Sequence, residues 1–193
     1  MSNRNRAETY VGYFEIFYDL ADERCRAYWG SNRPNGQAAG LESLVHFGGL
    51  VFEQLDSDAL VIDAGAGASS AILRTYFKNV VSCDPDADYL AQVQCACEAM
   101  GLGHGQWVAG IPDVMADATF YDYGAIERKP NIRAFLDRTK RIFWFDDAHD
   151  ADLMEEAARA CGERGLQLVY ARRAIDEHGR FGAYAVKGDA GAA

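Results

Sequence analysis

Short apolar runs alternate with helical stretches from Asp58 onward. Five runs have the length and the flanking turn residues of buried strands, and they are residues 59–62, 79–83, 106–109, 118–121 and 141–145. Between them the apolar positions follow the helical period, in a helix that ends near Phe77 and in helices over 86–100, 131–139 and 150–161. This alternation predicts βαβ units, and therefore an α/β, doubly wound and mostly parallel sheet.

The pattern changes after the last of these helices. Residues 166–175 and 181–186 have the composition of two strands on either side of a turn at 176–179. So short a connection predicts a C-terminal β-hairpin rather than a crossover. Residues 188–193 are expected to form a frayed tail.

The N-terminal part has a helical pattern of its own. Five aromatic residues lie on one face of a predicted helix over 8–29, namely Tyr10, Tyr13, Phe14, Phe17 and Tyr18. This face either packs on the domain or forms a lid over a pocket. A turn-rich linker at 30–36 and a second helix over 41–55 follow, although a Gly pair weakens the middle of that helix. We predict a helical cap over 1–57 on a ligand-binding unit over 58–193, together one structural domain.

Composition and charge narrow the expected partners. The chain has 193 residues and a formal net charge of -10, which disfavours broad contact with nucleic-acid phosphates. The apolar runs are shorter than the roughly 18 residues of a membrane span, and the polar N-terminus does not resemble a signal peptide. The sequence holds 5 cysteines and no C-x-x-C pair, which fits reduced thiols. We therefore expect a cytoplasmic protein that binds neither nucleic acid nor membrane.

A glycine-rich turn at 63–70 follows the first predicted strand and opens a helix. Glycines let the backbone pass close to a ligand, and a helix N-terminus offers free N–H groups. Asp84 ends the next predicted strand about 20 residues later, where a carboxylate commonly holds ribose hydroxyls. The spacing predicts a site for a ligand that contains a nucleoside.

The charges near this turn indicate which nucleoside ligand to expect. Asp63 stands two residues before Gly65, and no Lys or Arg occurs between Lys78 and Arg128, a stretch rich in acids. Two unit charges about 4 Å apart interact by about 4 kcal/mol at an effective dielectric near 20. A phosphate would therefore be repelled, whereas an ammonium and a sulfonium would be attracted. Ser70 also departs from the dinucleotide fingerprint, so the pattern favours S-adenosylmethionine over NAD or ATP.

These features resemble the class I S-adenosylmethionine-dependent methyltransferase family over roughly residues 58–187. The resemblance rests on the turn at 63–67, on Asp84 closing the second strand, on Asp113 after the third strand and on the closing hairpin. It implies a Rossmann-like sheet of seven strands in which the last strand is antiparallel. It also implies a function as a methyltransferase.

The resemblance assigns the glycine turn to the methionine part of the cofactor. Gly65 and Gly67 would pass under that part, and Asp63 would hold the amino group, often through water. Ser69 belongs to a Ser pair that opens the helix, as in one branch of the superfamily, and is counted among the cofactor-binding residues.

The remaining cofactor residues follow the second and third strands. Asp84 would bind both ribose hydroxyls. Asp113 would bind the adenine amine, and Ile111 would lie against the adenine ring.

Acids also follow the fourth and fifth predicted strands, at the edge where ligands of open parallel sheets bind. Asp122 comes after the fourth strand, and Asp147 and His149 come after the fifth. We predict that these three residues are catalytic, with Asp122 or His149 as the general base toward a hydroxyl, thiol or amine. In the alternative interpretation, Asp147 or Asp150 caps the next helix and His149 is solvated at its start.

The residues after the fourth and fifth predicted strands also indicate whether the protein binds a metal and which acceptors it methylates. We predict no metal, and the alternative is Mg²⁺ bound by Asp122, Asp146 and Asp147. Oxygen-methylating relatives bind a metal there, but through an Asp-Asn pair on the fifth strand. The Asn/Asp-Pro-Pro-aromatic stretch of the base- and amide-methylating branches is absent after the fourth strand, so those acceptors lose support.

Lys and Arg gather at residues 128–141. We expect them to form the solvated face of a helix, and the alternative is that they bind an acidic substrate or partner.

Three functions remain in view. The leading hypothesis is methyl transfer to the oxygen, sulfur or nitrogen of a small molecule. The second is an enzyme of the same fold that cleaves or cyclises S-adenosylmethionine without an acceptor, and the third is a non-catalytic binding subunit. The sequence does not decide between a monomer and a homodimer.

Overall fold

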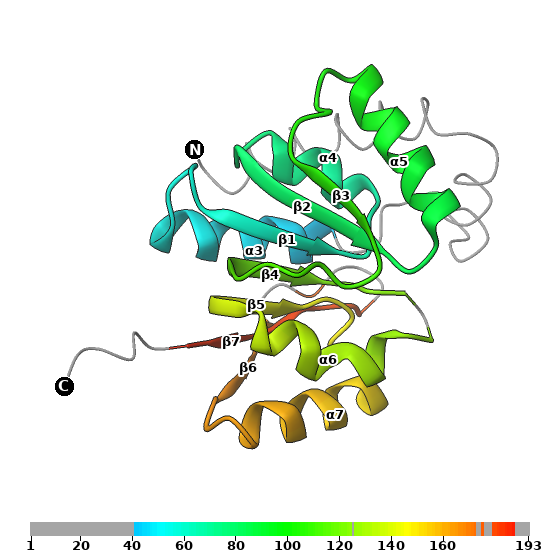
Figure 1. Cartoon of the computed structure of the whole chain (residues 1–193). Helices are drawn as coiled ribbons and strands as arrows, with labels where there is room; N and C mark the ends of the chain where they lie inside the picture. The colour runs from blue at the N-terminus through cyan, green and yellow to red at the C-terminus, as the bar shows by residue number, and fades with distance from the viewer. Residues whose placement is uncertain (1–40, 125, 173–174, 176–178, 188–193) are drawn as a thin grey trace.

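The computed structural model describes residues 41–124, 126–172, 175 and 179–187 (Figure 1). The aromatic stripe, the linker and the C-terminal tail expected from the sequence lie outside the described residues.

Seven strands form one mixed sheet in the order β3-β2-β1-β4-β5-β7-β6. β1 to β5 are parallel to one another, and β7 runs antiparallel to both β5 and β6. The strands are β1 (Leu60–Ala64), β2 (Asn79–Asp84), β3 (Gln106–Ala109), β4 (Ala116–Tyr121), β5 (Thr139–Phe145), β6 (Leu168–Tyr170) and β7 (Ala183–Val186). The predicted fold class, with its antiparallel last strand and C-terminal hairpin, is confirmed.

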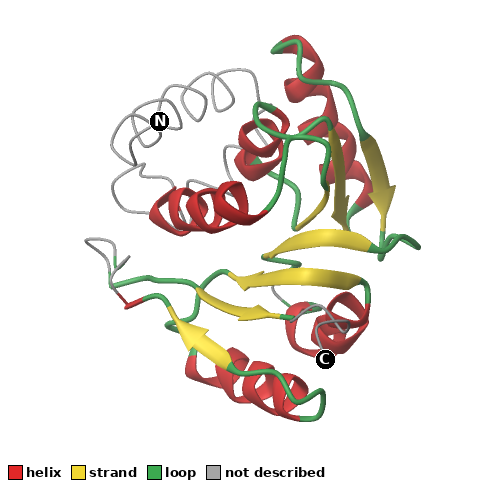
Figure 2. Cartoon of the chain, turned by 90° about the vertical axis from the view of Figure 1, so that its left-hand side faces the viewer, coloured by secondary structure: helices red, strands yellow, loops and turns green. Residues whose placement is uncertain are grey.

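Helices cover both faces of the sheet (Figures 1 and 2). They are α3 (Leu41–Gln54), α4 (Ala68–Arg74), α5 (Ala87–Ala99), α6 (Arg128–Asp137) and α7 (Ala151–Gly162). Because successive side chains of a strand point to opposite faces, Val61 packs with α3 and α4, whereas Ile62 packs with α6 and α7. Every described helix is too short or too polar to cross a bilayer.

α3 continues through the Gly pair that the sequence marks as weak. Phe47 and Val51 have no exposed surface. The Phe47 ring lies 5.5 Å from the ring of Phe120 and 6.1 Å from that of Trp144, between ring centroids. Burial of this face outweighs the poor helix propensity of Gly48 and Gly49, since tertiary packing supplies most helix stability in proteins.

Two element boundaries differ from the predictions. α6 begins at Arg128 rather than at residue 131, because Pro130 stands in the first turn, where the missing N–H would have no helical acceptor. β6 is shorter than the predicted strand over 166–175. The Leu166 N–H still donates to the carbonyl of Cys161 (2.9 Å) and so belongs to the end of α7.

Candidate functional site

The glycine turn lies at the carboxyl end of β1 and packs directly on the end of β4. The N–H groups of Gly65 and Ala66 donate to the carbonyl of Cys83 (2.8 and 3.2 Å). Gly65 has a φ of +98°, and a Cβ there would lie 2.1 Å from the carbonyl oxygen of Asp122. Gly67 has an extended backbone, which any residue adopts. The strict requirement for glycine therefore falls on Gly65.

The carboxylate of Asp63 lies underneath this turn and is fully buried. Ser69 donates to Oδ1 (2.7 Å), and Ser70 and Ser82 donate to Oδ2. Burial raises the pKa of Asp63, and the three hydroxyl groups oppose that shift. Asp63 has no exposed surface in this arrangement. Its observed role, shared with Ser69, is to fasten the turn to α4 and β2.

A buried arginine completes this network and was missed in the sequence. Arg74 donates to the hydroxyl of Ser82 (2.6 Å) and to the carbonyl of Ser70 (3.0 Å). Its guanidinium lies 3.8 Å from the centroid of the Trp107 ring, a cation–π distance. The charge of Arg74 offsets the buried charge of Asp63 across the shared serines, so α4, β1, β2 and β3 are tied together behind the turn.

Ser82→Ala tests this network. The substitution removes one donor from Asp63 and one acceptor from Arg74, and we expect it to lower the free energy of unfolding by about 1–3 kcal/mol, since buried charged groups lose a partner. Denaturant unfolding measures the effect. Ser57→Ala, at an exposed turn position, is the control and should change stability by less than about 0.5 kcal/mol. Equal effects of the two substitutions would argue against the network.

Asp84 ends β2 beside the glycine turn. Only 7% of the residue is exposed, and its Oδ1 accepts the N–H of Asp86 (2.9 Å). Within the described part of the chain, Oδ2 accepts no hydrogen bond. Loss of hydration raises the pKa of Asp84 to about 6; the Asp86 N–H opposes the shift, and the nearby acids Asp86, Asp63 and Glu127 add to it. Oδ2 of the carboxylate is thus available to accept hydrogen bonds. Hydroxyl donors would stabilise the ionised form, which burial makes unfavourable.

The two residues predicted to meet adenine follow β3. The N–H of Gly110 donates to the carbonyl of Asp84 (2.9 Å), which places the loop after β3 next to the end of β2. Ile111 is half-buried and packs against the core, whereas Asp113 is exposed, with Oδ1 4.0 Å from a guanidinium nitrogen of Arg138. The structure therefore brings Ile111 near Asp84, and it leaves the Asp113 side chain in solvent.

Three carboxylates converge where β4 and β5 end. One oxygen from each of Asp122, Asp146 and Asp147 lies within 4.8 Å of the others. Asp147 has a φ of +53°, a left-handed conformation that is uncommon outside glycine and often found at functional sites. Loss of hydration raises the pKa of Asp122 well above its usual range, the cation of Arg128 opposes that shift, and Asp146 and Asp147 add to it.

Arg128 does not lie on a solvated face, so that expectation is wrong for this residue. Only 18% of its side chain is exposed, because it turns inward from the first turn of α6. Its guanidinium bridges Asp147 Oδ2 (2.8 Å) and Asp122 Oδ1. Other cations of α6 pair with α7, as Lys129–Asp152, Arg133–Glu156 and Arg133–Glu163. A run of like charges in the sequence does not show which member turns inward.

His149 lies at the edge of the carboxylate cluster. Its side chain is 40% exposed, and Nδ1 is 3.8 Å from Asp147 Oδ1, beyond hydrogen-bond distance. Asp150 caps α7 by accepting the N–H groups of Asp152 and Leu153 (3.0 and 3.1 Å). The interpretation of Asp150 as the cap is therefore confirmed, and Asp147 is left to the cluster.

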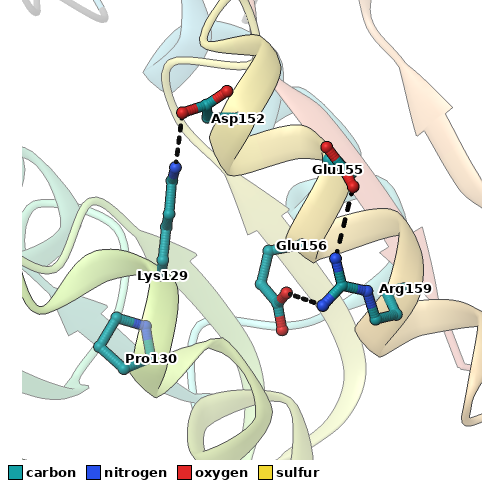
Figure 3. Close-up of a pocket in the computed structure, with 6 residues that line it drawn as sticks. All are labelled: Lys129, Pro130, Asp152, Glu155, Glu156 and Arg159. Carbon is teal, nitrogen blue, oxygen red and sulfur yellow. Dashed lines mark hydrogen bonds and ion pairs between the residues drawn. The ribbon is translucent and has the colours of Figure 1, made fainter.

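A groove of about 540 Å³ runs between α6 and α7 on the outer surface (Figure 3). Its charged side chains pair with one another: Lys129 with Asp152 (3.0 Å), and Arg159 with Glu156 (2.9 Å) and Glu155 (3.4 Å). It contains none of the residues predicted to bind the cofactor. We therefore place the candidate site at the carboxyl ends of the strands instead.

Comparisons with known proteins identify the fold of this chain, and they do not identify an acceptor for a methyl group. No protein-family model matches the sequence, and no curated protein does. Among solved structures, an rRNA methylase from Streptococcus thermophilus matches with a TM-score of 0.60 and 16% identity, over 75% of this chain and 95% of that one.

Two further structures contain the cofactor or its product. The magnesium protoporphyrin IX methyltransferase from Synechocystis PCC 6803, with bound SAM, matches with a TM-score of 0.60 and 17% identity, over 76% of this chain and 79% of that one. The O-methyltransferase from Bacillus cereus, in complex with SAH, matches with a TM-score of 0.57 and 12% identity, over 94% of this chain and 100% of that one. The strand order, the antiparallel β7 and these matches together show that the chain has the Rossmann-like fold of the class I S-adenosylmethionine-dependent methyltransferases.

Proposed function

We propose that the protein is an S-adenosylmethionine-dependent methyltransferase that acts on a small molecule. The observation that carries the proposal is the nearly buried carboxylate of Asp84 beside the Gly65 turn, with one oxygen that accepts no bond within the described residues. Two ribose hydroxyls would supply the missing donors. The stretch between Lys78 and Arg128, which contains Asp84 and the loop after β3, has no Lys or Arg, and this supports a cationic cofactor over a phosphate-bearing one.

The residues present fit the cofactor, with one change from the sequence prediction. Gly65 and Gly67 would lie under the methionine part, Asp84 would hold the ribose, and Ile111 would face the adenine ring. Asp63 would act from below by holding the turn rather than by contact with the amino group, as its buried carboxylate indicates. When bound, S-adenosylmethionine supplies an electrophilic methyl group on a sulfonium.

The chain's own contribution to the reaction would be positioning and proton removal. The acceptor atom would approach the methyl carbon in line as the methyl–sulfur bond breaks, and its proton would pass to a nearby base. Asp122 suits that role because loss of hydration raises the pKa of its carboxyl, and a carboxylate with a raised pKa is a stronger base. His149 is the second candidate, since its exposed ring lies beside the carboxylate cluster.

Calorimetry with S-adenosylmethionine, followed by product analysis with and without a cell extract, tests the proposal. Binding together with S-adenosylhomocysteine formed only with extract would support methyl transfer. Methylthioadenosine or a cyclised amino acid formed without extract would favour cleavage or cyclisation. Binding without consumption of the ligand would favour a non-catalytic subunit. Absence of binding would remove the cofactor assignment.

Substitution of the two candidate bases is expected to separate chemistry from binding. Asp122→Asn and His149→Ala should leave the affinity for S-adenosylmethionine nearly unchanged. The substitution at the true base should lower turnover by about 10²–10⁴-fold. Asp152→Asn, which removes an exposed acid of the groove between α6 and α7, is the control. Turnover equal to that of the control in both variants would rule out either residue as the base.

We further propose that the protein works in the reducing cytoplasm and does not bind nucleic acid. The described cysteines are free thiols, three of them buried, and the net charge is -10. A homodimer is a further proposal, and sedimentation of the full chain would test it.

A further inference from the structure

We infer that Arg128 is the resident cation of the Asp122–Asp146–Asp147 cluster and that it takes the place a divalent metal ion would need. Oxygens of the three carboxylates lie within 4.8 Å of one another. Arg128 spans two of them, through Nη1 to Asp147 Oδ2 (2.8 Å) and through Nη2 to Asp122 Oδ1. The cluster is therefore an occupied ion-pair site within the protein.

The arrangement does not fit a metal ion of the kind that the oxygen-methylating relatives imply. Mg²⁺ needs carboxylate oxygens at about 2.0–2.1 Å in octahedral geometry, and Ca²⁺ needs six to eight oxygens. One oxygen of Asp122 and one of Asp147 already accept the guanidinium. A divalent ion placed between them would also lie beside a fixed positive charge, and like charges at such distances repel strongly.

Arg128 is held in place by its backbone as well as by its side chain. It is the first residue of α6, and its carbonyl accepts the hydroxyl of Tyr121, the last residue of β4. The Tyr121 ring is buried and lies 5.2 Å from Phe135 of α6 and 5.3 Å from Phe143 of β5, between ring centroids. The position of the Arg128 cation is therefore fixed by the packing of α6 on β4 and β5, and Asp122 directly follows β4.

The consequence for catalysis rests on the proposed function. Methyl transfer would proceed without a divalent ion, and Arg128 would be a positioning residue that aligns Asp122 and Asp147 toward the acceptor. The assignment of the cation itself rests on geometry alone. It is tested without cofactor or acceptor, so its failure would leave the S-adenosylmethionine assignment untouched.

Mn²⁺ binding to the full chain tests the inference, by electron paramagnetic resonance of the free ion and by calorimetry. The wild type is expected not to bind Mn²⁺ at this cluster. Arg128→Met, which keeps an unbranched side chain and removes the charge, is expected to bind at least about tenfold more tightly than the wild type, because Asp122 and Asp147 then lose the cation that pairs with them. Arg128→Met with Asp146→Asn should lose that gain. Arg133→Met is the matched control, since it removes one cation from the same helix away from the cluster.

Two results would overturn the inference. One is Mn²⁺ binding by the wild type that Asp146→Asn or Asp147→Asn abolishes, because Arg128 would then not hold the place of a metal. The other is an Arg128→Met variant that folds, as shown by its melting curve, and binds Mn²⁺ no better than Arg133→Met. If Arg128→Met does not fold, the wild-type titration decides, and Arg128→Lys, which keeps a cation, should give the same absence of binding.

Discussion

Gly65→Ala is expected to lower the free energy of unfolding by about 2–5 kcal/mol and to abolish binding of S-adenosylmethionine. A left-handed backbone costs a residue with a Cβ about 1–2 kcal/mol, and crowding in a packed region adds about 1–3 kcal/mol. The new Cβ would lie 2.1 Å from the carbonyl oxygen of Asp122 and 2.5 Å from its carbonyl carbon. Because that neighbour is backbone at the end of β4, relief requires the turn or the strand to move. Denaturant unfolding and calorimetry measure the two effects.

Gly110→Ala is the matched control for this substitution. Gly110 has nearly the same φ, +92°, but a Cβ there would meet nothing within 4 Å. It should show only the conformational cost of about 1–2 kcal/mol. If the two variants lose equal stability, contact between the turn and β4 contributes nothing, and the placement of the turn would need revision.

Asp84→Asn should weaken S-adenosylmethionine binding by about 100-fold without lowering the stability of the cofactor-free protein. A hydrogen bond to a charged group contributes about 1.5–3 kcal/mol, and two ribose hydroxyls would lose their charged acceptor. The amide of Asn has nearly the same shape as the carboxylate of Asp84. The substitution also removes a buried charge that has lost hydration, so the cofactor-free protein should not lose stability. Calorimetry and thermal unfolding give the two readouts. Unchanged affinity would exclude Asp84 as the ribose ligand.

The pKa of about 6 for Asp84 predicts opposite effects of pH on affinity and on stability. The ionised form accepts the hydroxyls, so affinity should fall as pH drops below about 6. The folded pKa lies above the usual value of 3.8, so the folded state binds this proton more tightly than the unfolded state. The stability that this proton contributes is fully present below about pH 4 and is lost as pH rises through about 6. Asp84→Asn should remove both trends, and trends that persist in the variant would assign them to another group.

The sheet could be predicted from the sequence because its central strands β1, β2, β4 and β5 are largely buried and read as short apolar runs. Val80, Val81 and Cys83 of β2 have almost no exposed surface, because Val80 packs with α3 and α4 on one face and Val81 and Cys83 pack with α6 and α7 on the other.

The predicted boundaries of α6 and β6 were wrong because the residues there are compatible with more than one local structure. The prediction began this helix at residue 131, after Pro130, but a proline in the first turn also begins a helix, and α6 starts at Arg128. Leu166 is apolar and was counted with the predicted strand. Its N–H donates to the carbonyl of Cys161, so it belongs to the C-terminal end of α7.

The places of Gly65 directly after β1 and of Asp84 at the end of β2 were predictable, because each depends only on where one strand ends. The candidate site was not predictable where it depends on which strands become neighbours. Ser82 reaches Asp63 because β2 pairs with β1, with Asp63 opposite Ser82 in the register. Arg128 reaches Asp147 because β4 and β5 are adjacent and end together. Nothing in the local sequence around Arg128 distinguishes it from the outward-facing cations of the same helix.

The position of β7 between β5 and β6 has a consequence for the order of folding. Among the described strands, β7 comes last in the chain, and β6 pairs with no other of them. During synthesis, β1 to β5 can pair as they emerge, because each parallel neighbour is already present or soon follows. The edge of β5 must then wait, unpaired, until residues 183–186 leave the ribosome. Unpaired strand edges invite aggregation, so the free edge of β5 carries that hazard until β7 has been synthesised.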